Sequence, residues 1–422
     1  MHPKNINKTY LAVILFAAAL LLLSVPIVRV TQGNPAIPGS EHYEQVNQPS
    51  VLLSFLLGFI PQTILSISLP LLVALASLII FASLISRHVT HENQLYYALI
   101  ILVTTPSFIG LHIGLNNYQF VLFFGLLFAL LYDRGTKWYF LPLSILYLLS
   151  PLLSVVLTLG VIILSSVKEK GRESLTALFF LVGLLIISSV TSLSFPTFSS
   201  LGLTVDQIFS FFNAQYGYSL FLLVLGFGGL FFEKKRTIPL LIFLASLFFE
   251  PFRILGLALL SFYAAKSFFK LQEREWTITF IGNLTLLLFV CILLFSTSTF
   301  LKETIQSSPH QGHVDALIYL EENGAQARVL SDEKLTSFIT FMTGQEALSN
   351  NNYFYSQNYR YIDDRFKRED IGYILIDTSM LNGGIWQHDE EGLLFLLKYN
   401  DNFKKIYEND EVQIYYFAPW RE

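Results

Sequence analysis

Long apolar runs separated by short polar segments dominate the first 300 residues of the chain. A run of about 18 or more apolar residues with few charges is typical of a helix that spans a membrane. The pattern therefore predicts a polytopic α-helical membrane protein. The apolar runs cover about 10–28, 66–86, 95–113, 117–132, 138–166, 174–193, 216–232, 237–268 and 276–299.

Two of these runs are interrupted near their centres. The run 138–166 is broken at Pro151, and the run 237–268 is broken by the polar residues around Glu250 and Arg253. Basic residues flank both ends of each run, and basic residues collect on the cytoplasmic side of membranes. We therefore interpret both runs as helical hairpins with short arms, which brings the expected number of membrane helices to about eleven.

This count fixes an expected orientation. The first run follows Lys4 and Lys8 and is interpreted as an uncleaved first helix, with the N-terminus in the cytoplasm. The cytoplasmic loops then hold 14 Lys and Arg residues, whereas the outer side of the membrane half holds only Arg29 and Arg253. The first outer loop covers 31–65, and its apolar part, 47–62, is expected to lie along the outer membrane interface as an amphipathic helix.

The rest of the chain, residues 301–422, has a different composition from the membrane half, residues 1–300. Helices are predicted over 313–323 and 332–342. Strands rich in Val, Ile and Tyr are predicted over 327–330, 371–377 and 412–417. The alternation of helices and strands predicts a small extracytoplasmic α/β domain.

Composition excludes several classes of protein. Hydrophobic residues make up 53% of the 422 residues and charged residues only 14%, whereas soluble domains carry about 25% charged residues. The net charge is −4, and the segment after residue 300 holds 11 basic against 20 acidic residues. This acidic segment argues against a nucleic acid as partner. The single cysteine, Cys291, rules out an intrachain disulfide.

Motifs of soluble enzymes are missing. The chain has no P-loop, no dinucleotide-binding glycine motif, no H-E-x-x-H and no G-x-S-x-G. His310 and His313 have the spacing of metal ligands, but no acidic or cysteine partner comes before Asp315. Nucleotide hydrolysis, zinc proteolysis and serine hydrolase chemistry are therefore unsupported.

Four acidic residues of the membrane half fall on the expected outer side: Glu41, Glu44, Asp206 and Glu250. If the segment around His42 is helical, the i, i+3 spacing puts Glu41 and Glu44 on one face. Two carboxylates can hold a divalent cation, or one can act as a general base. The alternative is a polar loop whose acidic residues have an ordinary capping role.

Arg253 lies four to five residues into the expected membrane depth and close to Glu250. Charge at this depth usually marks a site. Either the two side chains form an intramembrane ion pair, or Arg253 binds an anionic head group, because guanidinium matches phosphate oxygens. His112 and Asn116 lie at the outer ends of the third and fourth helices, as helix-end polar residues or as supporting site residues.

Several short stretches resemble a known family. They are Pro38-Gly-Ser-Glu-His-Tyr-Glu44, Thr104-Thr-Pro-Ser-Phe-Ile109, Thr204-Val-Asp-Gln207 before Tyr216-Gly217, Phe252-Arg-Ile-Leu255, Val329-Leu-Ser331 and Met342-Thr-Gly-Gln345. Together with the order of parts, these stretches are similar to the GT-C-type glycosyltransferases, which take sugar from a polyprenyl-phosphate carrier. Within them the chain most resembles an archaeal relative of the oligosaccharyltransferase catalytic subunit and of dolichyl-phosphate-mannose mannosyltransferases.

The chain also departs from this family. The family's second acidic motif should place an Asp or Glu around 110–118, where the chain has His112-Ile-Gly-Leu-Asn-Asn117. The Trp-Trp-Asp motif of a sequon-reading outer domain is missing, and Ile385-Trp-Gln-His388 is a poor substitute. Transfer to Asn-x-Ser/Thr acceptors is therefore not favoured by the sequence.

The resemblance implies a membrane enzyme that moves a sugar or oligosaccharide from a polyprenyl- or dolichyl-phosphate donor to an extracytoplasmic protein or glycan. Glu41 would be the general base or, with Asp206, a ligand of Mg²⁺ or Mn²⁺; Glu44 would assist, and Arg253 would hold the leaving phosphate. Two alternatives remain: a non-enzymatic membrane protein with an extracytoplasmic binding domain, and a lipid or solute transporter. The supporting site residues would be His42, His112, Asn116 and Glu250.

Overall fold

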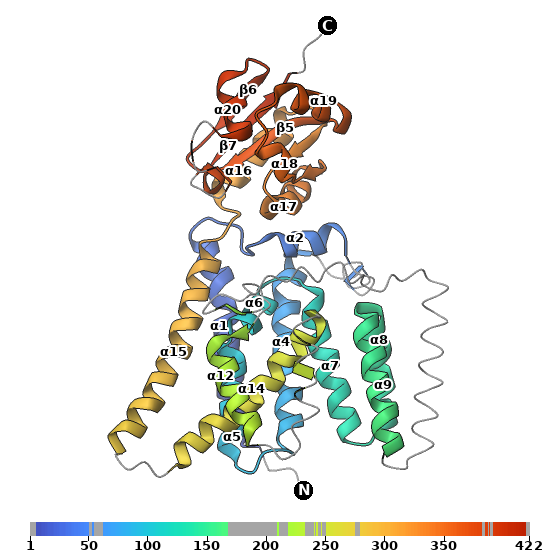
Figure 1. The fold of residues 1–422 in the computed structure, drawn as a ribbon, viewed down its shortest axis with the longest axis vertical. Coiled ribbons are helices and arrows are strands. Elements are labelled where there is room, and N and C mark those ends of the chain that lie inside the picture. The colour runs from blue at the N-terminus through green and yellow to red at the C-terminus, as the bar shows by residue number, and fades with distance from the viewer. Residues whose placement is uncertain are drawn as a thin grey trace. The chain divides into compact units, whose positions relative to one another are not determined.

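The computed structural model of the chain forms two compact units (Figure 1). The helical unit comprises Met1–Ser24 and Phe55–Glu303, and the sheet unit comprises Val25–Ser54 and Thr304–Glu422. The structure describes residues 6–49, 53–54, 62–167, 209–210, 218–232, 240, 242–243, 246, 250–274, 279–381, 385–386, 388 and 391–418.

The helical unit contains four described helices that are long and apolar enough to cross a membrane, or five if the bent pair α5 and α6 forms one span. These helices confirm a membrane protein with several spans. The count of eleven stays a prediction, because the expected span 174–193 lies outside the described residues. The elements are α1 (Lys8–Thr31), α4 (Gln62–Ile85), α5 (Glu92–Thr104), α6 (Pro106–Ile113), α7 (Asn117–Asp133), η1 (Lys137–Tyr139), α8 (Phe140–Leu149), α9 (Pro151–Val167), β1 (Phe209–Ser210), β2 (Tyr218–Ser219), α12 (Leu220–Phe231), α14 (Glu250–Glu273) and α15 (Thr279–Ile305).

The predicted break at Pro151 is present. Helix α8 ends at Leu149 and α9 begins at Pro151, and Ser154 Oγ donates a hydrogen bond of 2.9 Å back to the Leu143 carbonyl. The two helices therefore fold back on each other. The prediction of a short second arm in the run 237–268 is wrong, because α14 continues for 24 residues from Glu250 and is long enough to cross a membrane.

The predicted helix over 95–113 is divided into α5 and α6, which meet at 58°. Pro106 has no N–H to donate, and it disfavours the helical conformation of the residue before it. Thr105 accordingly has extended angles, φ −74° and ψ 133°. The bend thus has a local cause in the sequence. The predicted interface helix over 47–62 falls mostly outside the described residues.

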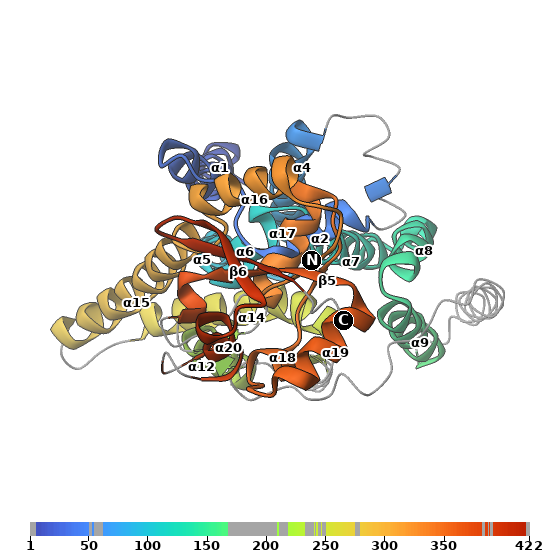
Figure 2. The ribbon, with the colours of Figure 1, turned by 90° about the horizontal axis from the view of Figure 1, so that it is seen from above.

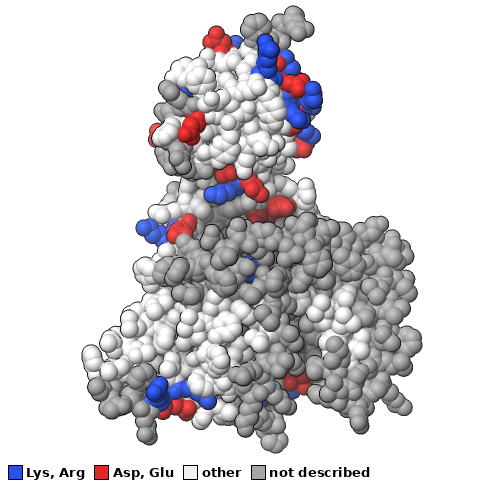
Figure 3. All heavy atoms as spheres, viewed as in Figure 1, with Lys and Arg blue, Asp and Glu red and all other residues white. Residues whose placement is uncertain are grey.

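The outer surface of the helical unit is suited to lipid. Only 22% of α1 and 17% of α15 is buried over their most apolar windows. Figure 3 shows that charged side chains on the described surface of this unit gather near its ends, with few between them. Inside the unit, α12 and α14 approach closely, because a Cβ on Gly229 would lie 1.9 Å from the Tyr263 carbonyl oxygen. Small residues allow such close helix packing in membranes.

The sheet unit contains a five-stranded mixed sheet in the order β4-β3-β5-β7-β6. Strands β4, β3 and β5 run parallel, and β5, β7 and β6 run antiparallel. The predicted α/β domain is therefore present as a fold. Its elements are α2 (Ser40–Asn47), α16 (Gln311–Asn323), β3 (Arg328–Leu330), α17 (Glu333–Thr343), β4 (Ala347–Leu348), α18 (Asn351–Phe354), α19 (Tyr359–Glu369), β5 (Ile371–Asp377), α20 (Gly392–Tyr399), β6 (Phe403–Glu408) and β7 (Val412–Phe417).

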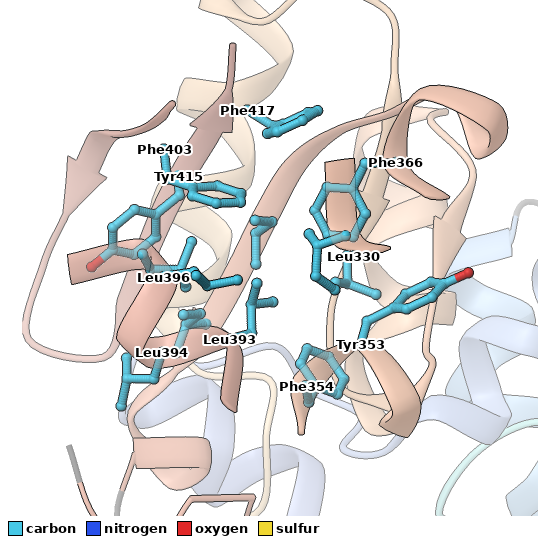
Figure 4. Close-up of a cluster of buried hydrophobic side chains, with 14 of the residues drawn as sticks. Leu330, Tyr353, Phe354, Phe366, Leu393, Leu394, Leu396, Phe403, Tyr415 and Phe417 are labelled. Atoms are coloured by element: carbon cyan, nitrogen blue, oxygen red, sulfur yellow. The ribbon is translucent and has the colours of Figure 1, made fainter. Parts of the chain in front are cut away.

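Helices cover both faces of this sheet. Figure 2 shows α16 and α17 on one side of β5, and α18, α19 and α20 on the other. Side chains of β5 alternate between two cores: Ile374 and Ile376 join the cluster beside α18, α19 and α20, whereas Tyr373 and Leu375 join the cluster beside α16 and α17. The first cluster is drawn in Figure 4. Burial on both faces explains the continuous apolar pattern of β5.

Candidate functional site

The acidic segment of the first outer loop forms helix α2, which meets the condition under which Glu41 and Glu44 share one face. Gly39 precedes it with φ +83°, a conformation that glycine adopts readily. Glu41 is half-buried and Glu44 is exposed. Their i, i+3 spacing on a helix places them on one face. The predicted pair of neighbouring carboxylates is therefore compatible with the local structure.

Helix α2 belongs to the sheet unit and is fixed to α17. The Tyr43 ring lies 4.8 Å from the Phe338 ring, centroid to centroid, and the Tyr43 hydroxyl donates a 3.0 Å hydrogen bond to the Ile37 carbonyl. One turn further on, Asn47 Nδ2 donates to the Ser337 carbonyl at 2.8 Å. These contacts determine which face of α2 is buried and which face carries the carboxylates.

His42 lies on the buried side of α2, with 7% of its surface exposed. Burial lowers its pKa from 6.5 to about 4, because the charged imidazolium would lose its hydration. His42 is therefore a neutral imidazole at neutral pH. The ring packs edge-on against Tyr43, at 5.0 Å between centroids.

Arg253 lies in the first turn of α14 and is 4% exposed. The neighbouring Phe252 packs with Val121 and Leu146 in a core cluster of the helical unit. The helix end that carries Arg253 is thus anchored in the apolar core. The side chain of Glu250 is not described, so the alternative of a Glu250–Arg253 ion pair stays open.

His112 is 2% exposed at the end of α6. Its Nδ1 lies 2.9 Å from the Phe108 carbonyl oxygen, which can only accept, so Nδ1 carries the proton and Nε2 is left as an acceptor. Within the described part of the chain, Nε2 is buried and has no hydrogen-bond partner. Asn116 has a clearer structural role: it caps α7, accepting a 2.8 Å bond from the Tyr118 N–H.

The sequence analysis missed Gln119, which is 0% exposed on the first turn of α7. Neither its amide oxygen nor its amide nitrogen has a hydrogen-bond partner among the described residues, and the same holds for Asn117 Oδ1. Leaving such buried groups unsatisfied costs about 1–3 kcal/mol each. We call His112, Asn117 and Gln119 the polar corner of the helical unit. The sequence signal for Gln119 was an amide at the start of an otherwise apolar run, two residues after Asn117.

The predicted site residues are divided between the two units. Glu41, His42 and Glu44 belong to the sheet unit, and His112, Asn116 and Arg253 belong to the helical unit. Asp206 lies outside the described residues. In the described part of the chain, no three His, Cys, Asp or Glu side chains come together to hold a metal ion. The divalent cation expected from Glu41 and Asp206 therefore stays a prediction.

A second buried polar cluster lies in the sheet unit around Asp377. The Ser379 N–H and hydroxyl donate to its carboxylate at 3.0 and 2.9 Å, and His313 Nε2 lies 3.5 Å from Oδ2. Burial raises the pKa of Asp377, but the bonds from His313 and Ser379 outweigh it and lower this pKa to about 2. Ser308 also donates to Asp377, so the hydroxyls bond the carboxylate and form no Ser-His-Asp relay.

Sequence comparisons identify no relatives: no protein-family model matches the chain, and no curated protein matches it. Several solved structures, in contrast, match the chain. The apo oligosaccharyltransferase of Archaeoglobus fulgidus superposes with a TM-score of 0.59 and 12% identity, over 89% of this chain and 70% of that chain. The chain has the fold of this archaeal oligosaccharyltransferase. The GT-C resemblance inferred from the sequence is thereby confirmed as a structural likeness.

Two further structures of the oligosaccharyltransferase agree with this result. One is tethered to an acceptor peptide with the NVT sequon, and it matches with a TM-score of 0.57 and 12% identity over 89% of this chain and 70% of its own. The other is a complex with Zn and sulfate, with a TM-score of 0.55 and 12% identity over 95% of this chain and 72% of its own.

Proposed function

We propose that the chain is a membrane glycosyltransferase that transfers a sugar or oligosaccharide from a polyprenyl- or dolichyl-phosphate donor to an extracytoplasmic protein or glycan. The observation that carries the proposal is the likeness to an oligosaccharyltransferase over 89% of the chain. An acceptor peptide bound by that fold supports an acceptor outside the membrane. We further propose that the N-terminus is cytoplasmic and the sheet unit extracytoplasmic.

Glu41 is the proposed general base. It would take the proton from the acceptor as the acceptor attacks the anomeric carbon of the sugar, while the bond from this carbon to the lipid-phosphate oxygen breaks. The half-buried position of Glu41 on a helix fixed by Tyr43 and Asn47 supports this role. His42 is neutral beside it, so no fixed positive charge from that ring weakens the base.

Arg253 is the proposed partner of the leaving phosphate. It lies in the first turn of α14, where the helix dipole favours an anion. A buried guanidinium would stabilise the negative charge that grows on the phosphate as the glycosidic bond breaks. The polar corner supplies further groups of the kind that bind sugar hydroxyls: an imidazole acceptor and two amides.

A divalent cation is proposed as an additional component, held by Glu41 and Asp206. A related fold was solved with Zn and sulfate. The described residues alone do not fit a complete metal site, because no three His, Cys, Asp or Glu side chains among them come together. No step above therefore depends on the cation.

The test is a comparison of variants of the full chain in liposomes that contain radiolabelled dolichyl-phosphate mannose, with membrane extract as acceptor. Arg253→Leu should reduce sugar release by about 100-fold or more, and Glu41→Gln by about 10²–10⁴-fold. Arg87→Leu is the matched control, because Arg87 follows α4 and pairs at 3.2 Å with Asp133, the last residue of α7, and its loss should leave turnover unchanged. Unchanged turnover in Arg253→Leu would remove the proposed phosphate site.

A further inference from the structure

The turn between α7 and α8 carries two cationic side chains that the proposed transfer reaction does not use, Arg134 and Lys137. Both residues are exposed, and neither side chain forms an ion pair or a hydrogen bond within the described part of the chain. Their acidic neighbour, Asp133, is already engaged: its two carboxylate oxygens lie 3.2 Å from Arg87 Nη1 and 3.3 Å from His88 Nε2. The described acids therefore leave the two positive charges of the turn uncompensated.

The turn is closed by hydrogen bonds onto the last turn of α7. Gly135 has φ +68°, the left-handed conformation with which a glycine commonly ends a helix and reverses the chain. The N–H and the hydroxyl of Thr136 then both donate to the Leu131 carbonyl, at 3.2 and 3.1 Å. These bonds fix the short segment between Arg134 and Lys137. The two cations are therefore presented together on one hydrogen-bonded turn.

This turn lies at the level of a membrane surface. The ion pair between Arg87 and Asp133 holds the end of α7 beside the end of α4, which is long and apolar enough to cross a membrane (Figure 1). Trp138 is 74% exposed, and tryptophan is enriched where membrane helices meet the lipid head groups. Leu141 and Leu148 extend this exposed apolar face along α8 at helical spacing. The two cations therefore lie at head-group level, beside side chains suited to lipid.

We propose that the α7–α8 turn binds the phosphate of an anionic phospholipid. Arg134 and Lys137 would pair with the phosphate oxygens, and Trp138 would lie among the neighbouring head groups. Basic side chains next to membrane helices attract anionic lipids in this way. A zwitterionic lipid fits less well, because its ammonium group would lie near the same two cations. The assignment does not depend on the proposed transfer activity, since it uses none of the residues assigned to that reaction.

Native mass spectrometry of the full chain in a neutral detergent measures this binding, because each bound lipid adds its own mass. The probes are dioleoyl phosphatidylglycerol, dioleoyl phosphatidylcholine as the zwitterionic lipid with the same acyl chains, and glycerol phosphate as the free head-group anion. The first phosphatidylglycerol should bind at least about fivefold more tightly than phosphatidylcholine, and glycerol phosphate should not bind at the same concentrations. Equal affinity for the two lipids, or binding of glycerol phosphate as tight as that of the lipid, would overturn the proposal.

Variants locate the site. Arg134→Gln with Lys137→Gln should weaken the binding of the first phosphatidylglycerol by about tenfold or more, because each basic side chain near the head groups contributes to the attraction. The matched control is Lys302→Gln with Lys334→Gln, which removes two exposed lysines, one in the last turn of α15 and one near the start of α17. The control changes the net charge equally and should change the affinity by less than about twofold. An equal loss in the control, or an unchanged affinity in the first variant, would overturn the assignment.

Discussion

Two fully buried polar side chains, Arg29 in the sheet unit and Gln119 in the helical unit, have opposite properties. In the sheet unit, Arg29 is 0% exposed, and all three of its guanidinium nitrogens donate to backbone carbonyls, those of Pro35, Thr304, Ile305, Ser307 and Pro309. In the helical unit, Gln119 is equally buried, yet its amide has no partner among the described residues.

This difference can separate buried polar side chains with a structural role from those with a ligand-binding role. A fully bonded buried group stabilises its surroundings, and its loss leaves other groups unsatisfied. An unbonded buried group lowers stability, so its presence calls for an explanation, such as a bound water, an ion or a ligand that completes its hydrogen bonds. By this criterion we expect Arg29 to hold the sheet unit together, and we expect His112 and Gln119 to contribute to a binding site. The variants below test the criterion.

The largest effect is expected at Arg29. Arg29→Leu removes the donors to five carbonyls within the sheet unit, and unsatisfied buried acceptors cost about 1–3 kcal/mol each. We expect a loss of about 3 kcal/mol or more in the free energy of unfolding of this unit, measured by its thermal transition in detergent. Arg328→Leu is the control, because Arg328 is half-exposed and pairs with Glu346 at the surface. Equal losses in the two variants would contradict the role of Arg29.

Asp377→Asn should destabilise the sheet unit by about 2 kcal/mol at pH 7, the free energy that corresponds to a pKa lowered to about 2 from 3.8. Because the folded pKa lies below the unfolded one, this stability is present above pH 4 and is lost as the pH falls from about 4 to 2. Urea unfolding at pH 7 and pH 2 measures both effects. A variant as stable as the wild type at pH 7 would show that Asp377 is not held by His313 and Ser379.

Local patterns predicted some elements of the fold and missed others, among them α18, α19, α20, β4 and β6. Long-range contacts could not be predicted from local patterns. Strands β5 and β7 have the predicted bounds, since each is a continuous apolar and aromatic segment whose pattern is local. The pairing of His313 with Asp377 joins residues far apart in the chain, and the spacing of His310 and His313 alone could not indicate it. The sequence left open whether the segment around Glu41 is a helix or a loop, and it gave no indication of the attachment of α2 to α17.

Gln119→Leu sharpens the comparison most directly. If the Gln119 amide forms its hydrogen bonds with a ligand, its removal should leave the stability of the helical unit unchanged or slightly higher. The rate of sugar transfer should fall about tenfold, which corresponds to about 1.4 kcal/mol. Gln94→Leu is the matched control, because Gln94 is also buried but its Oε1 accepts bonds from the Thr90 N–H at 3.2 Å and the Thr90 hydroxyl at 3.3 Å. This variant should lose about 1 kcal/mol of stability.

The two measurements on each glutamine variant are a thermal melt in detergent and the liposome transfer assay. The comparison fails if Gln119→Leu destabilises the protein as much as Gln94→Leu and leaves transfer intact. In that case the amide of Gln119 is bonded within the folded protein, and the polar corner is structural.

The smallest effect is expected from the pH dependence of α2 packing. The pKa of His42 falls from 6.5 to about 4 in the folded state, so the unfolded chain binds more protons between these values. Stability from this group is therefore complete above about pH 7 and decreases as the pH falls below 6.5. Between pH 7 and 5.5 the sheet unit should lose about 1 kcal/mol, which a His42→Phe variant should not lose.

Because α2 carries Glu41, the thermal transition should be followed alongside transfer at both pH values. If the wild type and His42→Phe show the same pH dependence of melting, His42 is exposed to water, and the buried face of α2 is not the one that fixes the direction of Glu41.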